Sequence, residues 1–341
     1  MSGPLHGVNI VEFEAIGPGP LCGRMLAGMG ARVTVIARPA SSKLQAQFGA
    51  ADLEWSRGKT RLVLDLKDPA QREQALRLAA GADALIEGNR PGVMERLGLG
   101  PAALALHNPA LVYGRMTGWG QSGPLAQTAG HDLNYAALSG TLAVSAHRGA
   151  VPILPPAVAG DGAGALGLAF GIACALFEVR RTGKGKVVDA AIVDIMAMVG
   201  GIAQWAEAAG QLGGENAGLF HDSPFYDVYR CADGGFITIG ALEPPFYALL
   251  LEKLQLTDID PAAQFDRAAW PALKGRLRVL FLQRTRQAWC ELLEGTDACF
   301  APVLSLAEAA RHPHNVARAN FASNAAGALF GNAAPRFSDL A

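Results

Sequence analysis

Residues 7–36 read GVNIVEFEAIGPGPLCGRMLAGMGARVTVI, and they contain the clearest fold pattern in the chain. The apolar run at 7–13 predicts a strand, and the glycine and proline residues at 17–20 predict a turn. A helical stretch follows up to Met29, and 32–36 is a second run rich in β-branched residues. A strand, a helix and a strand in this order predict a β-α-β unit, whose two strands run parallel.

The same alternation continues beyond this unit. Further strands are predicted at 62–65, 84–87 and 111–115, with helical spacing between them, for example at 70–79. Strands that alternate with helices indicate an α/β fold, with a mostly parallel sheet that helices cover on both faces.

Two long apolar helices are predicted at 161–181 and 190–209, separated by a glycine break and a short strand at 187–189. The longest uncharged apolar stretch, 162–177, is shorter than the roughly 20 residues that a membrane-spanning helix needs. We therefore expect a buried helix there and no insertion into a membrane.

A different pattern starts after the glycine-rich loop at 210–221. Residues 227–239 (DVYRCADGGFITI) predict two strands around an Asp-Gly-Gly turn. Helical spacing follows at 246–254, 271–283 and 286–293. These elements predict a second, smaller α+β domain.

The composition narrows the classes of function. The 341 residues carry 29 basic and 30 acidic side chains, with no long run of either sign, which argues against binding to nucleic acid or to an anionic membrane surface. The N-terminus has no cationic segment followed by an apolar run, which predicts a cytoplasmic protein. The five cysteines form no C-x-x-C pattern, so neither disulfides nor a metal site is expected. The low charged fraction of 17% fits an extensive subunit interface.

Polar side chains gather at 130–135 (GHDLNY), directly before the apolar helical run at 136–142. This is the position of a helix N-terminus, where such residues cap the helix or take part in catalysis. In the first interpretation Asp132 or Asn134 caps the helix and His131 packs beside it. In the second, free N–H groups stabilise a developing oxyanion while His131 acts as a base. The spacing leaves both interpretations open.

Two further carboxylates stand out by their surroundings. Asp161 is the only charge between Arg148 and Glu178, and it precedes a helix rich in alanine and glycine. It is either an N-cap or a partly desolvated carboxylate for proton transfer. Glu243 lies between a predicted strand and a predicted helix, where capping is again the simpler interpretation.

Several longer sequence segments, which together extend over nearly the whole chain, resemble those of a known protein family. They are GPLHGVNIVEFEAIGPGP, VLDLK, LIEGNRPGVMERLGLGP, LVYGRMTGWGQSGPLAQTAGHDLNY, RTGKGKVVDAA, CADGGFITIGALEPPFYA and APRFS. In these strings the chain resembles the class III CoA-transferase superfamily, specifically its α-methylacyl-CoA racemase branch. The resemblance implies an isomerase that interconverts (2R)- and (2S)-2-methylacyl-CoA thioesters by proton transfer through an enolate. Coenzyme A is then part of the substrate, and neither a prosthetic group nor a metal is required.

The resemblance also implies roles for single residues. The catalytic pair of the racemases falls on His131 and Asp161, and the glutamate that supports the histidine falls on Glu243. Transferase relatives use the aspartate at the position of Asp132 as a nucleophile and lack the preceding histidine. The alternatives are therefore a CoA-transferase that uses Asp132, or a non-catalytic homologue that binds acyl-CoA.

The family's contacts with CoA fall on residues in three of these strings and on Arg38, which follows the second predicted strand. Arginine suits this ligand because its planar guanidinium pairs with phosphate oxygens. The expected CoA-binding residues are Arg38, Leu64, Asp65, Leu66, Lys67, Gly88, Asn89, Arg90, Arg96, Gly130, Leu133, Asn134 and Tyr135.

By the same resemblance, a Rossmann-like large domain spans 1–189 and is completed by 312–341. A linker helix and loop cover 190–221, and the small α+β domain covers 222–311. Two chains are expected to interlock as a homodimer, with the site between the large domain of one chain and the small domain of the other. Glu243 would then act across the subunit boundary.

Overall fold

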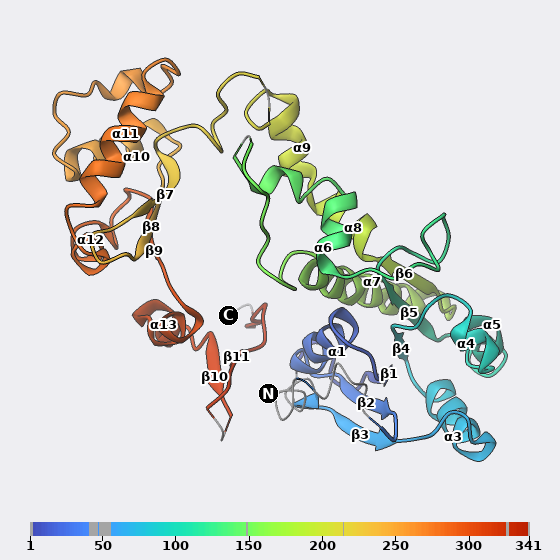
Figure 1. Ribbon diagram of the computed structural model, residues 1–341. Helices are drawn as coiled ribbons and strands as arrows, with labels where there is room; N and C mark the ends of the chain where they lie inside the picture. The colour runs from blue at the N-terminus through green and yellow to red at the C-terminus, as the bar shows by residue number, and fades with distance from the viewer. Residues whose placement is uncertain are drawn as a thin grey trace. The chain divides into compact units, whose positions relative to one another are not determined.

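The computed structural model describes residues 3–40, 47, 56–147, 149–213, 215–324 and 327–339. The chain divides into two compact units (Figure 1). The first consists of Met1–Ala143, Ile153–Gly200 and Ala322–Ala341, and the second of Val144–Pro152 and Gly201–Phe321. The linker expected at 190–221 is thus divided between the two units.

A six-stranded parallel sheet organises the first unit. Its strand order is β3-β2-β1-β4-β5-β6, which is the order of doubly wound nucleotide-binding folds. The α/β fold and its parallel sheet are thereby confirmed, and each expected strand is present within two residues of its predicted bounds. The strands are β1 Asn9–Phe13, β2 Arg32–Ala37, β3 Thr60–Val63, β4 Ala84–Glu87, β5 Val112–Thr117 and β6 Val187–Ala191.

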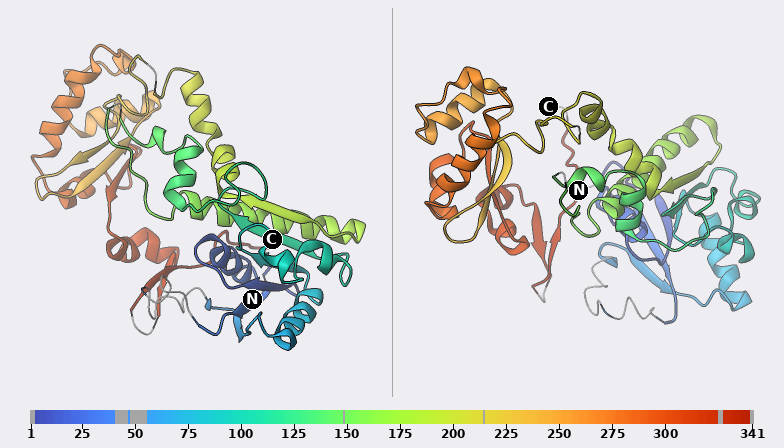
Figure 2. Two further views of the ribbon diagram at one scale, coloured as in Figure 1. Left: turned by 45° about the vertical axis from the view of Figure 1, so that its right-hand side comes forward. Right: turned by 45° about the horizontal axis from the view of Figure 1, so that its top comes forward.

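Helices cover both faces of this sheet (Figure 2). Ile10 and Ile86 pack with α1, α7 and α8 on one face, whereas Val11 and Leu85 pack with α3, α4 and α5 on the other. Successive residues of a strand point to opposite faces of the sheet. When helices cover the two faces, successive residues must therefore all be apolar. The helices are α1 Pro18–Gly28, α3 Pro69–Ala80, α4 Val93–Arg96, α5 Pro101–Ala105, α6 Asp132–Leu138, α7 Gly160–Thr182 and α8 Ile192–Val199.

Helix α7 is longer and less buried than expected. Among the described residues it is the one helix long and apolar enough to cross a membrane, with a mean hydropathy of 1.8 over an 18-residue window of which 28% is buried. Leu168 and Ile172 are buried against the sheet, but Phe170 and Phe177 are 69% and 66% exposed. The prediction of a buried helix is therefore wrong for the face that carries Phe170 and Phe177, because a helix on an open sheet buries only the face that touches the sheet.

The single helix predicted at 190–209 is also corrected. It is two helices, α8 and α9 (Gly201–Ala208), which meet at Gly200. Two consecutive glycines lower the helix propensity at this point. Gly200 is the last residue of the first unit in this part of the chain, so the break coincides with the boundary between the units.

The second unit contains a three-stranded antiparallel sheet in the order β7-β8-β9. The hairpin predicted at 227–239 is confirmed as β7 Tyr226–Arg230 and β8 Phe236–Gly240, and β9 Phe300–Val303 joins it. Phe225, Trp270 and Trp289 lie in its core. Its further helices are α10 Pro244–Lys253, α11 Trp270–Phe281, α12 Arg286–Leu293, α13 Leu306–Arg311 and α14 Pro313–Ala317, with a short 3₁₀ turn at Pro261–Ala263. Another short 3₁₀ turn, Ala143–Ser145, lies where the chain passes from the first unit to the second.

Two short strands near the C-terminus, β10 Phe321–Ser323 and β11 Leu329–Gly331, form a further two-stranded sheet. Arg24 of α1 donates a hydrogen bond to the carbonyl oxygen of Gly331 at 3.1 Å. The ring of Phe330 stacks with the guanidinium groups of Arg24 and Arg57, at 5.1 and 3.9 Å from its centroid. Within the first unit, these contacts fasten β11 to α1 and to the segment that carries Arg57.

Candidate active site

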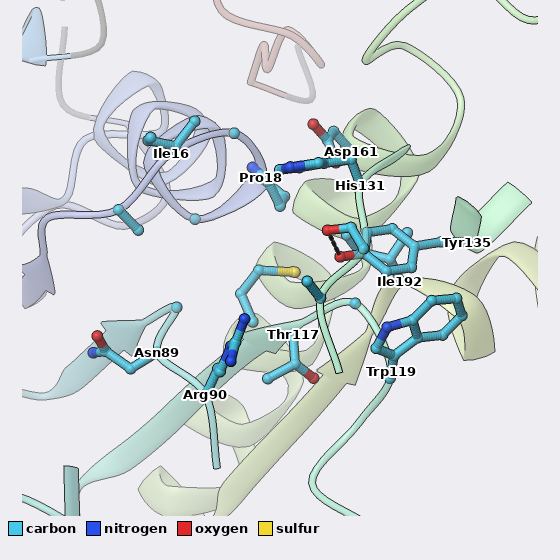
Figure 3. A pocket seen from close by; sticks show the side chains of 18 of the residues that line it. Ile16, Pro18, Asn89, Arg90, Thr117, Trp119, His131, Tyr135, Asp161 and Ile192 are labelled. Atoms are coloured by element: carbon cyan, nitrogen blue, oxygen red, sulfur yellow. Dashed lines mark hydrogen bonds between the residues drawn. The ribbon is translucent and has the colours of Figure 1, made fainter. Parts of the chain in front are cut away.

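A pocket of about 410 Å³ lies at the carboxyl ends of the parallel strands (Figure 3). The loop after β1 contributes Ile16 and Pro18, the loop after β4 contributes Asn89 and Arg90, and the loop after β5 contributes Trp119. In the sheet, β2 lies on one side of β1 and β4 lies on the other. The loops that follow β1 and β4 therefore diverge, and a crevice opens between them. Such crevices are the usual ligand sites of open α/β sheets.

Eight of the predicted site residues line this pocket. They are Arg38, Gly88, Asn89, Arg90, Gly130, His131, Tyr135 and Asp161. The remaining ones lie outside its lining, and their roles stay predictions: Leu64, Asp65, Leu66, Lys67, Arg96, Asp132, Leu133, Asn134 and Glu243. Leu64 is 5% exposed and packs in the core cluster that includes Ala75 and Ala79 of α3.

His131 is the residue directly before α6. Its backbone N–H donates to the side-chain oxygen of Asn134 at 3.0 Å, and its carbonyl oxygen accepts from the backbone N–H of Asn134 at 2.8 Å. This closed pair of bonds fixes the first turn of the helix. The imidazole of His131 projects into the pocket from that turn (Figure 3).

Asp132 caps a different helix from the expected one. Its carboxylate accepts hydrogen bonds from the backbone N–H of Asp161 at 2.7 Å and of Ala157 at 3.3 Å, so it serves the N-terminus of α7. Gly160 permits this approach, because a Cβ atom there would lie 2.6 Å from a carboxylate oxygen of Asp132. The capping interpretation of Asp161 is wrong: Ala159 is the N-cap, and the Asp161 side chain lines the pocket instead.

The electrostatics of Asp161 follow from this arrangement. The pKa of its carboxyl group is raised from 3.8 to about 6: burial is the largest cause, the negative charge of Asp132 also raises the pKa, and His131 acts in the opposite direction. The pocket therefore pairs an imidazole with a carboxyl group that titrates close to neutrality. Such a pair can move protons on and off a bound molecule near pH 7.

Two aromatic side chains shape the loop that carries His131. Tyr135 donates a hydrogen bond from its hydroxyl group to the carbonyl oxygen of Gly130. Its ring meets that of Trp119 edge to face, with centroids 4.7 Å apart. A Cβ atom at Gly118 or Gly130 would lie 2.0 or 2.8 Å from the tyrosine ring. Trp119 and Gly118 are not among the residues that the sequence predicts for the site, although both belong to the GWG of a matched string.

Carboxylates also hold the arginine-bearing loops. Glu14 accepts the backbone N–H of Arg38 at 2.9 Å, and its backbone carbonyl accepts the Arg38 guanidinium at 3.1 Å. Glu87 accepts the backbone N–H of Asn89 at 2.7 Å, and burial raises the pKa of Glu87 to about 7. Arg38, Asn89 and Arg90 thus stand on braced loops, and guanidinium groups of this kind bind phosphate oxygens.

Glu243 lies in the second unit, at the residue before α10. Its carboxylate makes no capping hydrogen bond there, so the capping interpretation does not account for it. Its expected role beside His131 stays a prediction.

A sequence profile of CoA-transferase family III matches residues 5–339. The chain belongs to this family. Human alpha-methylacyl-CoA racemase is 41% identical to it over 325 residues, which cover 93% of this chain and 82% of the human protein. The racemase of Mus musculus is 41% identical over 321 residues with the same coverage. The crystal structure of Rv3272 from M. tuberculosis has a TM-score of 0.81 and 26% identity, and it covers 99% of this chain and 93% of that chain.

These similarities confirm the resemblance seen in the matched strings. Membership of CoA-transferase family III implies a CoA thioester as substrate. The pocket suits such a substrate because it holds guanidinium groups, which bind phosphate oxygens, beside an imidazole and a carboxyl group.

Proposed function

We propose that this member of CoA-transferase family III is a racemase that interconverts (2R)- and (2S)-2-methylacyl-CoA. One observation carries the proposal: His131 and Asp161 line the same pocket, and the pKa of Asp161 is raised to about 6. A racemase needs two groups in opposite protonation states. At pH 7 a carboxyl group with this pKa is protonated in about a tenth of the molecules, which suffices for a reversible reaction.

The reaction removes the α-proton on one face of the substrate and returns a proton on the other. Neutral His131 takes the proton from one epimer while protonated Asp161 donates, and the roles reverse for the other epimer. The thioester delocalises the carbanion into an enolate, whose oxygen the backbone N–H groups near Asp132 would hold. Each proton-transfer group typically accelerates such a step by about 10²–10⁴-fold.

The CoA moiety would bind along the loops that carry Arg38 and Arg90. Their guanidinium groups suit the 3′-phosphate and the pyrophosphate of CoA. In Figure 3, Asn89 and Arg90 project from the loop after β4, whereas His131 and Asp161 project from the starts of α6 and α7. This separation suits a substrate whose nucleotide and reacting carbon lie far apart.

The alternative of CoA transfer by Asp132 has less support. Both carboxylate oxygens of Asp132 accept backbone N–H groups at the start of α7. An acyl anhydride at this carboxylate would have to break at least one of these hydrogen bonds. Asp161, by contrast, has a carboxyl group that lines the pocket.

We further propose the homodimer that the sequence resemblance implies. Apolar side chains on the outer faces of α7 and α8 support it, because Phe170, Phe177 and Met198 are each more than 60% exposed. In that dimer Glu243 would orient His131 across the subunit boundary. Size-exclusion chromatography with light scattering tests this proposal: a dimer is expected for the native chain and a monomer for Phe170→Glu, whereas a native monomer contradicts it.

The function is tested by incubation with (2R)-2-methylacyl-CoA in D₂O, following α-deuterium incorporation and the epimer ratio together. We expect both in the native protein and neither in the His131→Ala/Asp161→Ala double variant. His107→Ala, which removes an exposed histidine outside the pocket, should retain both. CoA exchange with free carboxylic acids, in place of epimerisation, would instead support the transferase.

A further inference from the structure

Gln264 of the second unit has a buried amide side chain. The residue is 2% exposed and directly follows the short 3₁₀ turn Pro261–Ala263. Its amide nitrogen Nε2 donates to the carbonyl oxygen of Ala241 at 3.1 Å and to that of Leu242 at 3.0 Å. Both of these neighbours are acceptors, so the nitrogen and not the oxygen of the amide must face them.

The two carbonyl groups belong to the residues directly before Glu243, in the connection from β8 to α10 (Figure 1). Ala241 is fully buried, and its backbone N–H donates to the carbonyl oxygen of Phe225 at 2.9 Å. The connection is therefore held from two sides, by Phe225 and by Gln264. Beyond it, the carbonyl oxygen of Glu243 accepts the backbone N–H of Tyr247 at 3.0 Å, within α10.

Two prolines keep the carboxylate of Glu243 from an ordinary capping role. Pro244 and Pro245 occupy the first two positions of α10, and proline has no backbone N–H. One of the two donors that an N-cap side chain usually meets is thus missing, and the Glu243 carboxylate makes no capping hydrogen bond. Its direction depends on the backbone at 241–243, which is the segment that Gln264 holds.

Packing and stability alone do not explain the amide of Gln264. Its oxygen Oε1 is buried and has no hydrogen-bond partner in the part of the chain that the structure describes. A buried acceptor without a partner costs free energy, which offsets part of the gain from the two hydrogen bonds of Nε2. The backbone carbonyl of Gln264 accepts the indole N–H of Trp270 at 2.8 Å, so the residue is anchored independently of its side chain.

We infer that Gln264 is a positioning residue, which fixes the backbone before Glu243 and thereby the direction of the Glu243 carboxylate. This inference rests on the proposed function, in which Glu243 orients His131 across the subunit boundary. A group that orients a catalytic side chain acts through geometry, and a displacement of about 1 Å can lower a rate about 10²-fold. Loss of the two hydrogen bonds should therefore lower kcat and leave KM nearly unchanged.

The experiment is a double-mutant cycle of Gln264→Met and Glu243→Gln, followed by α-deuterium incorporation into 2-methylacyl-CoA. Methionine is similarly long and flexible but cannot donate a hydrogen bond. We expect Gln264→Met to lower kcat at least about tenfold and to change KM less than about twofold. In the Glu243→Gln background the same substitution should change kcat less than about twofold, because no carboxylate remains to be positioned. An equal loss in both backgrounds, or no loss in either, would overturn the inference.

The matched control is Tyr229→Phe. It removes another buried hydrogen bond of the second unit, from the Tyr229 hydroxyl group to the carbonyl oxygen of Pro224 at 2.6 Å. We expect a loss of stability in urea comparable to that of Gln264→Met, with kcat unchanged within about twofold. A fall in kcat as large as that of Gln264→Met would mean that any loss of stability in this unit suffices, and would contradict a positioning role. If Gln264→Met does not fold, Gln264→Asn replaces it, because its amide is one methylene group too short to reach both carbonyl groups.

Hydrogen-exchange mass spectrometry separates failure of this inference from failure of the proposed function. The backbone amides at 241–247 should exchange at least about fivefold faster in Gln264→Met than in the native protein, whereas those of α12 should keep their rates. If the native protein exchanges no α-proton, the proposed function fails, yet faster amide exchange confined to 241–247 still supports the hold of Gln264 on this segment. Unchanged amide exchange there would overturn the inference whatever the activity.

Discussion

The carboxylate of Asp132 accepts the backbone N–H of Asp161 at 2.7 Å. This bond joins the first turn of α6 to the first turn of α7, and each of these turns presents one proposed proton-transfer group to the same pocket. His131 directly precedes Asp132, so the bond fixes the spacing of the histidine and Asp161. Asp132 thus positions the pair and also sets the charge beside Asp161.

Two substitutions of Asp132 separate its electrostatic effect on Asp161 from its structural effect on the start of α7. Asp132→Asn removes the negative charge that raises the pKa of Asp161, so the limb of the pH profile of kcat that reports Asp161 should move to lower pH. Asp132→Ala also removes the cap of α7 and should lower the free energy of unfolding by a further about 0.5–2 kcal/mol. A pH profile that does not move in Asp132→Asn would contradict the electrostatic role.

Gly160 and Gly162 form a matched pair on α7. A Cβ atom at Gly160 would lie 2.6 Å from the Asp132 carboxylate, whereas at Gly162 the nearest atom would lie 3.9 Å away. Gly160→Ala should therefore cost about 1–3 kcal/mol of stability and reduce kcat. Gly162→Ala should be neutral or stabilising, because alanine favours the helix. Urea denaturation measures the stability of each variant, and the α-proton exchange assay measures its kcat. Equal effects of the two substitutions would refute the steric argument.

Asp161 should lower the stability of the fold at neutral pH. Its pKa is raised from 3.8 to about 6, so between these values the folded protein keeps a proton that the unfolded chain has lost. The stability contributed by this carboxyl group therefore falls as the pH rises through that window. Asp161→Asn should unfold at higher urea concentration than the native protein at pH 7.5, by about 1–3 kcal/mol, and the difference should vanish near pH 4. A constant difference at both pH values would contradict the raised pKa.

Glu87 should act on CoA binding and not on proton transfer. It is 3% exposed and accepts the backbone N–H of Asn89, so Glu87→Ala leaves the pocket loop without its brace. We expect the dissociation constant of CoA, measured by calorimetry, to rise about tenfold. Glu73→Ala, at an exposed ion pair with Arg77, should leave it unchanged. A fall in kcat without a change in affinity would assign Glu87 to a different role.

The ion pair of Lys59 and Glu12 lies beneath α1, with side chains 0% and 2% exposed and 2.6 Å between the charged atoms. Lys59 also donates to the carbonyl oxygen of Pro20 at 2.8 Å. Lys59→Met leaves a buried carboxylate without its partner and should cost about 3–5 kcal/mol in urea denaturation. The control Lys186→Met breaks an exposed pair with Glu178 and should cost less than about 1 kcal/mol. Similar costs for the two variants would argue against a buried pair.

Local sequence patterns were sufficient to predict the helices and strands in which apolar residues recur with a clear period. The strand at 84–87 and the helix at 286–293 have their predicted bounds, because uninterrupted apolar runs and helical spacing are properties of neighbouring residues. The strands β10 and β11 were not predicted. Three residues are too few for an alternating pattern, and such strands form only where another segment pairs with them.

For the site, the sequence by itself determined which residue types were available: a histidine before a helix, a lone carboxylate in an apolar segment and arginines after strands. It left open whether Asp132 and Asp161 cap helices or take part in chemistry. Only the tertiary structure decided this, because a cap is defined by which backbone N–H groups a carboxylate meets, and Asp132 meets those of a segment about 29 residues further along the chain. The cavity of about 990 Å³ between α1 and β11 likewise exists only where α1 and a distant C-terminal strand converge, and no local pattern encodes the space between two such segments.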